Sequence, residues 1–590
     1  MEGALTPNWA LCTIAHSGLL RFVETVRRTW LRVCVCSLSS AGAVWGQEVR
    51  RGKKPSFFEK LGVCADLVPL QGVVRESFVL SNANALAAAS SRRAGLRTAL
   101  RTALAQIEAY PLERTWRPAF LTPLSALPHP QRAALADLTG KRPMVAPFGG
   151  QPLTIGSALA GLRTRTLTAA DLLQAVLAAI GRSAQDPNAL LFIPPAAELR
   201  AEAEALDAEL RAGVCRGLLH GIPLLTPDRL DVAGMPASAD AHALDSRPAC
   251  SDAGSVRLLR AAGALFVAQT RTNGPARNGA SSARRGRAGD GGEEDGASGA
   301  AAAVARGMSM GAPVPDACGS LHGTAARYGL VSYKPTFGLI PNDGAHLSSW
   351  SIDQVGCLAL TVEDAALLLD VLDPAPHMRY SQALFKALRG VHIGLPLALL
   401  ERAEAGAAAA VRAAAAAMRR AGAEIAEIET PGAEDVELAQ AAALVLRRAE
   451  AAAYWAFAGR LRTQDSAPAP APVGARPVAR LAEEAGRVSA AHYLQAQRIR
   501  EDLRWRLLRL FDRCDALLLP PGRADAEGFG PAQSLAQNSV LWSLLGFPTV
   551  SLPCGWTPQQ APIGAELVAA PYADTRLLSI AAALELELRG

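Results

Sequence analysis

From residue 153 onwards, the chain alternates between two patterns of apolar and polar positions. Apolar residues three and four apart predict helices, which fall at Ile155–Ala179 in two pieces with Thr168 as the second cap, Glu198–Ala212, Ser255–Ala262, Ala300–Gly307, Val362–Leu372, Gly406–Ala421 and Val488–Phe511. Short apolar runs predict strands, at Leu218–Leu225, Ala264–Gln269, Val391–Pro396, Ala516–Leu519, Leu545–Pro553 and Pro562–Val568. Helices and strands that alternate in this way indicate an α/β sandwich.

The first 143 residues lack this regular pattern and are interpreted as an N-terminal extension. Residues 1–54 carry eight basic and three acidic side chains, which fits either an organellar targeting segment or a disordered terminus. Residues 91–107 predict a helix. Two later stretches, Gly274–Gly299 and Ser466–Pro477, are rich in small residues and proline and predict a flexible loop and a linker or insertion.

Composition and charge argue against several classes of function. No run of about 18 apolar residues occurs, so no membrane-spanning helix is expected. The net charge of +6 is small for 590 residues, and nucleic acid is not an expected partner. Ten scattered cysteines and nine scattered histidines form neither a Cys-x-x-Cys nor a His-Glu-x-x-His motif, so neither a metal site nor another cofactor is expected. The cytoplasm is the default compartment.

A loop of small residues, Asp316-Ala317-Cys318-Gly319-Ser320, is the strongest candidate for chemistry. A serine beside several backbone N–H groups can attack a carbonyl carbon while those groups hold the oxygen that becomes negative. Gly-Ser loops are common, and most are only turns. The loop alone is therefore weak evidence that Ser320 is a nucleophile, and the surrounding sequence must show whether it is one.

Taken together, short motifs spread over residues 153–590 resemble the amidase signature family. The matching segments are His220–Pro223, Asp231–Pro236, Leu258–Ala264, Ala301–Ala305 with Gly307, Asp316–Ser320, Lys334–Gly338, Asp353–Gly356, Leu360–Ala365 and the two C-terminal strands. This family includes amidases, allophanate hydrolase and the A subunit of the tRNA-dependent glutamine amidotransferase. The resemblance implies an α/β/α sandwich with a central mixed β-sheet flanked by helices, and serine-dependent hydrolysis of a carboxamide C–N bond.

The resemblance also implies a relay in which a neutral buried lysine takes a proton from a bridging serine, which takes one from the nucleophile. Carried over to this chain, the nucleophile is Ser320 and the oxyanion loop is Asp316, Ala317, Cys318 and Gly319. Cys318 stands where a second glycine is usual.

Two positions of the implied relay depart from the family pattern. The lysine position is Pro227, which has no ionisable group, and the bridging-serine position is Gly296. Ser298 could replace the bridging serine if the loop slips by a residue or two. Three hypotheses follow from these departures.

In the first hypothesis, the protein binds an amide ligand in the ancestral cleft but has impaired or lost catalysis, as a pseudoenzyme does. In the second, it is an active amidase with another base, either His322, two residues after Ser320 in an extended segment, or Asp228. In the third, it is a partner in an amidotransferase-like complex. The expected ligand is a small-molecule amide, and the sequence leaves the oligomeric state open, a homo-oligomer included.

Overall fold

The computed structural model describes residues 98–110, 153–182, 190–236, 248–271, 297–376, 379–384, 387–463, 487–520, 538–558 and 561–589. The chain divides into two compact units, Met1–Ala88 and Ala89–Gly590, and all of the described residues belong to the second. Gly296, the Gly274–Gly296 part of the predicted flexible loop and the predicted linker Ser466–Pro477 lie outside the described residues.

Besides a helix at residues 98–109, the helices of the described residues are α3 Ile155–Thr164, α4 Ala169–Arg182, α5 Ala196–Arg211, α6 Gly254–Ala261, α7 Ser298–Ala305, α8 Ser320–Tyr328, α9 Val362–Leu372, α10 Leu397–Glu401, α11 Ala405–Arg420, α12 Ala433–Thr463, α14 Ala490–Leu508, α16 Ser539–Leu545 and α17 Asp574–Arg589, with 3₁₀ turns η4 Tyr380–Ala383 and η5 Arg509–Asp512. The strands are β1 Leu190–Phe192, β2 Pro223–Pro227, β3 Leu265–Thr270, β4 Gly311–Asp316, β5 Val331–Lys334, β6 Gln354–Ala359, β7 His392–Pro396, β8 Glu424–Ile428, β9 Ala516–Leu519, β10 Thr549–Trp556 and β11 Pro562–Val568.

The centre of this unit is an eight-stranded mixed sheet in the order β4-β6-β5-β10-β11-β9-β7-β8. Its β7–β8 and β7–β9 pairs are parallel, whereas β4–β6, β5–β6, β5–β10, β10–β11 and β9–β11 are antiparallel. A second sheet, β1-β3-β2, contains the parallel pair β2–β3. The predicted α/β fold with a central mixed sheet is confirmed.

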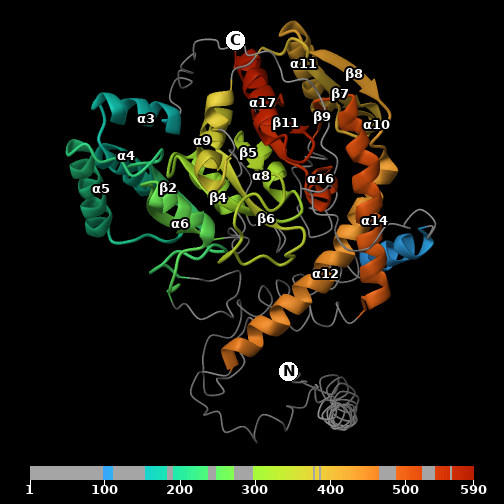
Figure 1. Ribbon diagram of the computed structural model, residues 1–590, viewed down its shortest axis with the longest axis horizontal. Coiled ribbons are helices and arrows are strands. Elements are labelled where there is room, and N and C mark those ends of the chain that lie inside the picture. Colours follow the sequence, from blue (N-terminus) through green and yellow to red (C-terminus); the bar gives the residue numbers. More distant parts are fainter. Residues whose placement is uncertain are drawn as a thin grey trace, which may run out of the picture. The chain divides into compact units, whose positions relative to one another are not determined.

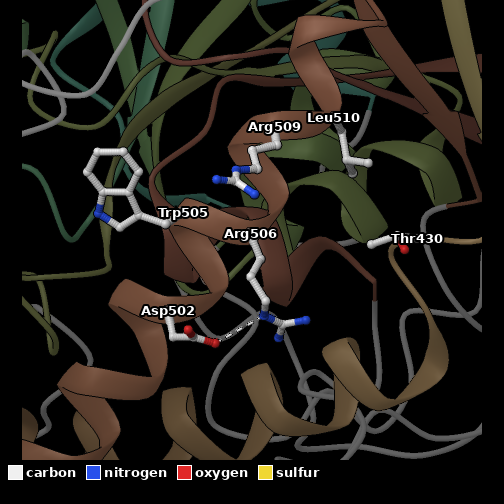
Figure 2. A pocket seen from close by; sticks show the side chains of 6 residues that line it. All are labelled: Thr430, Asp502, Trp505, Arg506, Arg509 and Leu510. Carbon is white, nitrogen blue, oxygen red and sulfur yellow. Dashed lines mark hydrogen bonds and ion pairs between the residues drawn. The ribbon is translucent and has the colours of Figure 1, made fainter. Parts of the chain in front are cut away.

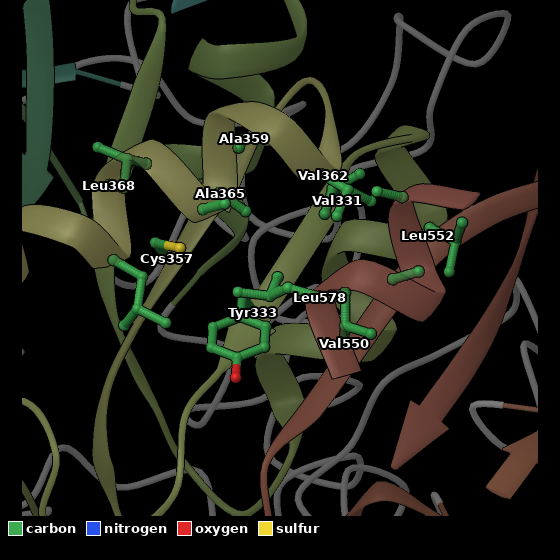
Figure 3. Packing of buried hydrophobic residues seen from close by; sticks show 14 of the residues in the cluster. Val331, Tyr333, Cys357, Ala359, Val362, Ala365, Leu368, Val550, Leu552 and Leu578 are labelled. Carbon is green, nitrogen blue, oxygen red and sulfur yellow. The ribbon is translucent and has the colours of Figure 1, made fainter. Parts of the chain in front are cut away.

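Alternate residues of the central strands face two different layers of helices. On one face, Tyr333 of β5 and Val550 of β10 pack with Leu368 of α9 and Leu578 of α17 (Figure 3), and α9 and α17 lie side by side (Figure 1). The residues next along these strands, Ser332 and Ser551, belong to the opposite face because side chains alternate in a strand. That opposite face is covered by α8. It carries the site described below.

Local capping explains why several predicted elements agree with the structure. Thr361 accepts a hydrogen bond from the Asp364 N–H at 3.0 Å, and α9 begins at the next residue, as predicted. Thr168 caps α4 through the Asp171 N–H. The strand predicted at Leu218–Leu225 is partly wrong: residues 218–221 form turns, and β2 begins only at Pro223.

The N-terminal extension contributes a helix at residues 98–109, where the sequence predicts one at 91–107. Its apolar side chains Leu100, Ala103 and Ile107 are buried in the same cluster as Ile499 and Leu503 of α14. Polar contacts flank this interface, since the Tyr110 hydroxyl donates to Asp502 at 2.7 Å and the Glu108 carboxylate lies 2.7 Å from His492 Nε2. This part of the extension therefore packs on α14.

Candidate active site

Ser320 lies where β4 ends and α8 begins. The chain leaves β4 at Asp316, turns over residues 317–319, and enters α8 with Ser320 as its first residue. The serine is only 5% exposed, and its Oγ has no hydrogen-bond partner among the described residues. N–H groups in the first turn of a helix carry partial positive charge. A hydroxyl at this point therefore lies beside groups that favour developing negative charge.

The carboxylate of Asp316 fixes the shape of this turn. Its Oδ2 accepts from the Gly319 N–H at 2.9 Å and from the Ser543 hydroxyl of α16 at 3.0 Å, and its Oδ1 accepts from the Leu321 N–H at 3.0 Å. Asp316 is fully buried, so these donors replace the water it has lost. Within the predicted oxyanion loop, the Gly319 N–H is thus committed to Asp316.

Two successive residues of the turn adopt left-handed backbone conformations. Gly319 has φ 85°, which suits glycine, and Cys318 has φ 56°. A left-handed conformation costs a residue with a Cβ atom roughly 1–2 kcal/mol, which explains why a glycine at position 318 would fit without strain. The Cys318 side chain is buried, and its packing stabilises the left-handed conformation of this residue.

Pro227, the position of the implied lysine, is the last residue of β2 and is buried opposite Thr270 of β3. The next residue, Asp228, is also buried, and its backbone N–H donates to the Thr270 carbonyl at 2.9 Å. Arg229 points its guanidinium at the His346 carbonyl and the Ser348 hydroxyl, at 3.0 and 2.8 Å. The strand end at which the resemblance implies a base thus carries a proline ring.

Ser298, the candidate substitute for the bridging serine, is the first residue of α7 and is half-buried. The family position itself, Gly296, lies outside the described residues. The bridging role of either residue therefore remains an expectation from the resemblance.

His322 occupies a different place from the one its hypothesis requires. The segment after Ser320 is helical and not extended, so side chains two residues apart diverge by about 200°. The His322 ring is fully buried, and its Nδ1 lies 2.8 Å from the Ser332 hydroxyl on β5. Burial lowers the pKa of His322 to about 4. The charge of Asp316 opposes this by raising the pKa, and the nearby Lys334 lowers it a little further. This geometry does not support His322 as the base for Ser320.

Beneath the turn lies a buried polar cluster that sequence reasoning missed. Lys334, the only lysine among the described residues, is fully buried on β5 and donates to the Phe547 carbonyl at 2.5 Å. Burial lowers its pKa to about 8, and the nearby carboxyl groups of Asp316, Asp574 and Glu566 oppose this effect. Glu566 of β11 accepts a hydrogen bond from Ser539, the first residue of α16. Two signals are present in the sequence: Lys334 begins the segment Lys334–Gly338 that resembles the family, and Glu566 lies inside the apolar strand pattern Pro562–Val568.

A separate surface pocket lies beside the C-terminal end of α14. It is lined by Thr430, Asp502, Trp505, Arg506, Arg509 and Leu510 (Figure 2). Arg506 is paired with Asp502 at 3.0 Å and with Asp435 at 2.9 Å, so its charge is already balanced. No residue of the sequence-predicted site lines this pocket.

Neither a metal cluster nor a membrane span is found in the part of the chain that the structure describes. These residues contain no group of three or more His, Cys, Asp or Glu side chains placed to hold a metal ion. Within the same ranges, no helix has both the length and the apolar character needed to cross a membrane.

Comparisons with known proteins agree on one family. The family model described as Amidase matches residues 171–578. An amidase of Pseudomonas putida is 30% identical over 438 residues, covering 69% of this chain and 90% of that protein. The A subunit of the glutamyl-tRNA(Gln) amidotransferase of Anaeromyxobacter dehalogenans is 30% identical over 475 residues, covering 74% and 96%.

Solved structures give the same answer. A crystal structure of an amidase has a TM-score of 0.62 at 29% identity and covers 74% of this chain and 99% of that one. The peptide amidase from Stenotrophomonas maltophilia has a TM-score of 0.59 at 27% identity, covering 75% and 98%. The strand–turn–helix around Ser320 thus belongs to a chain that these proteins resemble over nearly their full lengths, and the chain is a member of the amidase family.

Proposed function

We propose that this protein binds a small-molecule amide with its carbonyl group at Ser320, and that it cleaves the carboxamide C–N bond slowly because the proton relay has been lost. The observation that carries the proposal is the contrast between two strand ends. After β4, Ser320 lies buried at a helix N-terminus with a hydroxyl that makes no hydrogen bond among the described residues. At the end of β2, the lysine position holds Pro227.

The expected rate follows from what each half of the site contributes. A serine hydroxyl is a poor nucleophile until a positioned base removes its proton, and such a base contributes about 10²–10⁴-fold to the rate. The N–H groups of Gly319 and Leu321 already donate to Asp316, but the partial positive charge at the start of α8 still favours the developing oxyanion. Some acceleration over water is therefore retained. In this proposal, the protein binds amides well but hydrolyses them slowly.

A role within a larger complex is the second candidate. The observation that favours it is that relatives such as the Anaeromyxobacter protein are named as one of the subunits of an amidotransferase. Purification of the full-length chain from its own source separates the two: co-purifying subunits in fixed proportion favour this candidate, and a chain that purifies alone favours the first.

Intact-mass labelling with a fluorophosphonate tests Ser320 directly. Wild-type protein should form a single adduct slowly, and Ser320→Ala should form none, because the probe reacts with the serine at the α8 N-terminus. Ser551→Ala is a matched control, since Ser551 is also buried and its Oγ also has no hydrogen-bond partner among the described residues.

Each variant must unfold with a thermal midpoint close to that of the wild type before its labelling is compared. The control should keep the adduct. A folded wild type without any adduct, or an adduct that persists in Ser320→Ala, would contradict the proposal.

A further inference from the structure

Helix α16 lies directly behind the turn that carries Ser320. Ser539 and Ser543 are four residues apart and therefore share one face of this helix. Ser543 donates to Asp316, and a Cβ atom placed on Gly319 would lie 2.4 Å from the Cβ of Ser539. One face of α16 thus contacts the turn at both its carboxylate and its glycine. An interaction that holds α16 in place therefore also positions the turn that carries Ser320.

Ser539 is held in turn by Glu566 in the interior of the sheet. Its hydroxyl donates to Glu566 Oε1, while Glu566 is fully buried on β11 between Ser551 of β10 and Leu519 of β9. Glu566 Oε2 has no hydrogen-bond partner among the described residues. A buried ionised carboxylate with an unsatisfied oxygen is far more costly than a neutral carboxyl group in the same place.

We propose that Glu566 is a positioning residue for the nucleophile turn: its carboxyl group, in the uncharged form, anchors Ser539 and thereby holds the first turn of α16 against Gly319. The inference rests on the proposed function only in taking Ser320 as the nucleophile. The contact chain runs from Glu566 through Ser539 to Gly319, and it touches neither Ser320 Oγ nor a substrate.

The charged and titratable groups around Glu566 agree with an uncharged carboxyl group. Burial raises the pKa of Glu566 to about 8, the hydrogen bond from Ser539 lowers it, the negative charge of Asp316 raises it, and Lys334 lowers it. From α8, the His322 ring faces the same layer and is neutral above its own pKa of about 4. In this form Glu566 adds no negative charge to the layer that contains Asp316 and Lys334.

The test compares Glu566→Gln with Glu566→Ala and Ser539→Ala. Glutamine has the shape of a neutral carboxyl group and keeps an acceptor for the Ser539 hydroxyl, whereas alanine removes it. Two quantities are measured: hydrogen exchange at the Gly319 and Leu321 amides, and the fluorophosphonate labelling rate of Ser320. The alanine variants should lose about tenfold or more in exchange protection and in labelling, and the glutamine variant should stay within about twofold of wild type.

Glu585→Ala is the matched control. Glu585 is a buried carboxyl group on α17 that accepts from the Val362 N–H at 3.0 Å, away from the turn. It should lower the thermal midpoint while leaving exchange at Gly319 and Leu321 unchanged. Ser539→Ala keeps the test valid if Glu566→Ala does not fold, because it removes only one hydroxyl.

The outcomes separate this inference from the proposed function. Unchanged exchange in Ser539→Ala and Glu566→Ala would overturn the positioning role. A glutamine variant as impaired as the alanine variant would also overturn it, because the uncharged form would then not suffice. If exchange follows the prediction but wild-type protein does not label at Ser320, the positioning role stands and the proposed function fails.

Discussion

Pro227→Lys combined with Gly296→Ser is expected to speed fluorophosphonate labelling of Ser320 by about a hundredfold, near the lower end of what a positioned base contributes. The pair restores the lysine and the bridging serine that the family resemblance implies. Position 227 is buried at the end of β2, so desolvation would lower the pKa of the new lysine towards neutrality and let it accept a proton.

Pro227→Met with Gly296→Ser is the control for this restoration. Methionine has a similar length and removes the proline just as lysine does, but it has no ionisable group. It should label at the wild-type rate. Equal rates in the lysine and methionine variants, with both folded, would show that the missing base is not what limits Ser320.

Gly319→Ala should abolish most of the labelling. Gly319 has φ 85°, and an added Cβ atom would lie 2.4 Å from the Ser539 Cβ and 2.7 Å from the Ser539 carbonyl carbon. The backbone of Ser539 cannot move aside as a flexible side chain could, so the turn at Gly319 must shift away from α16. We expect labelling to fall by more than about tenfold and the free energy of unfolding to fall by about 1–3 kcal/mol.

Gly338→Ala is a close control because Gly338 also has φ 85° and no heavy atom lies within 4 Å of an added Cβ. It should cost about 1 kcal/mol from backbone strain alone and leave labelling unchanged. If both variants label equally well, close contact between Gly319 and α16 is unimportant for the site. Unfolding by urea and the labelling rate together measure the two effects.

Elements whose local sequence agrees with their surroundings could be predicted. Val362–Leu372 was placed correctly because Thr361 caps it and its apolar residues recur at helical spacing. Ala516–Leu519 was placed correctly because a short apolar run without helical spacing fits a buried strand. Ser320 stood out because small residues gather before it. These signals lie within a few residues of one another.

The features that the sequence did not predict correctly depend on contacts between residues distant in sequence. The residues after Ser320 contain glycine and histidine, which are weak helix formers, and α8 exists because it packs on β5, β10 and β11. His322 consequently faces Ser332 instead of Ser320. Ser539 and Glu566 meet only because the fold brings the first residue of α16 next to β11, a contact between positions 27 residues apart. No local pattern carries that information.

The pH dependence of Ser320 labelling between about pH 6 and about pH 10 tests the central claim, the absence of a protein base, most directly. This range lies above the pKa of about 4 of His322 and crosses the pKa of about 8 of both Lys334 and Glu566, so a base with such a pKa would produce a plateau within it. Without a base in the site, the rate should rise in proportion to hydroxide across the whole range, with a logarithmic slope of about one and no plateau. A flat profile, or a plateau that persists in Glu566→Gln, would show that a side chain already activates Ser320 and would contradict the loss of the relay.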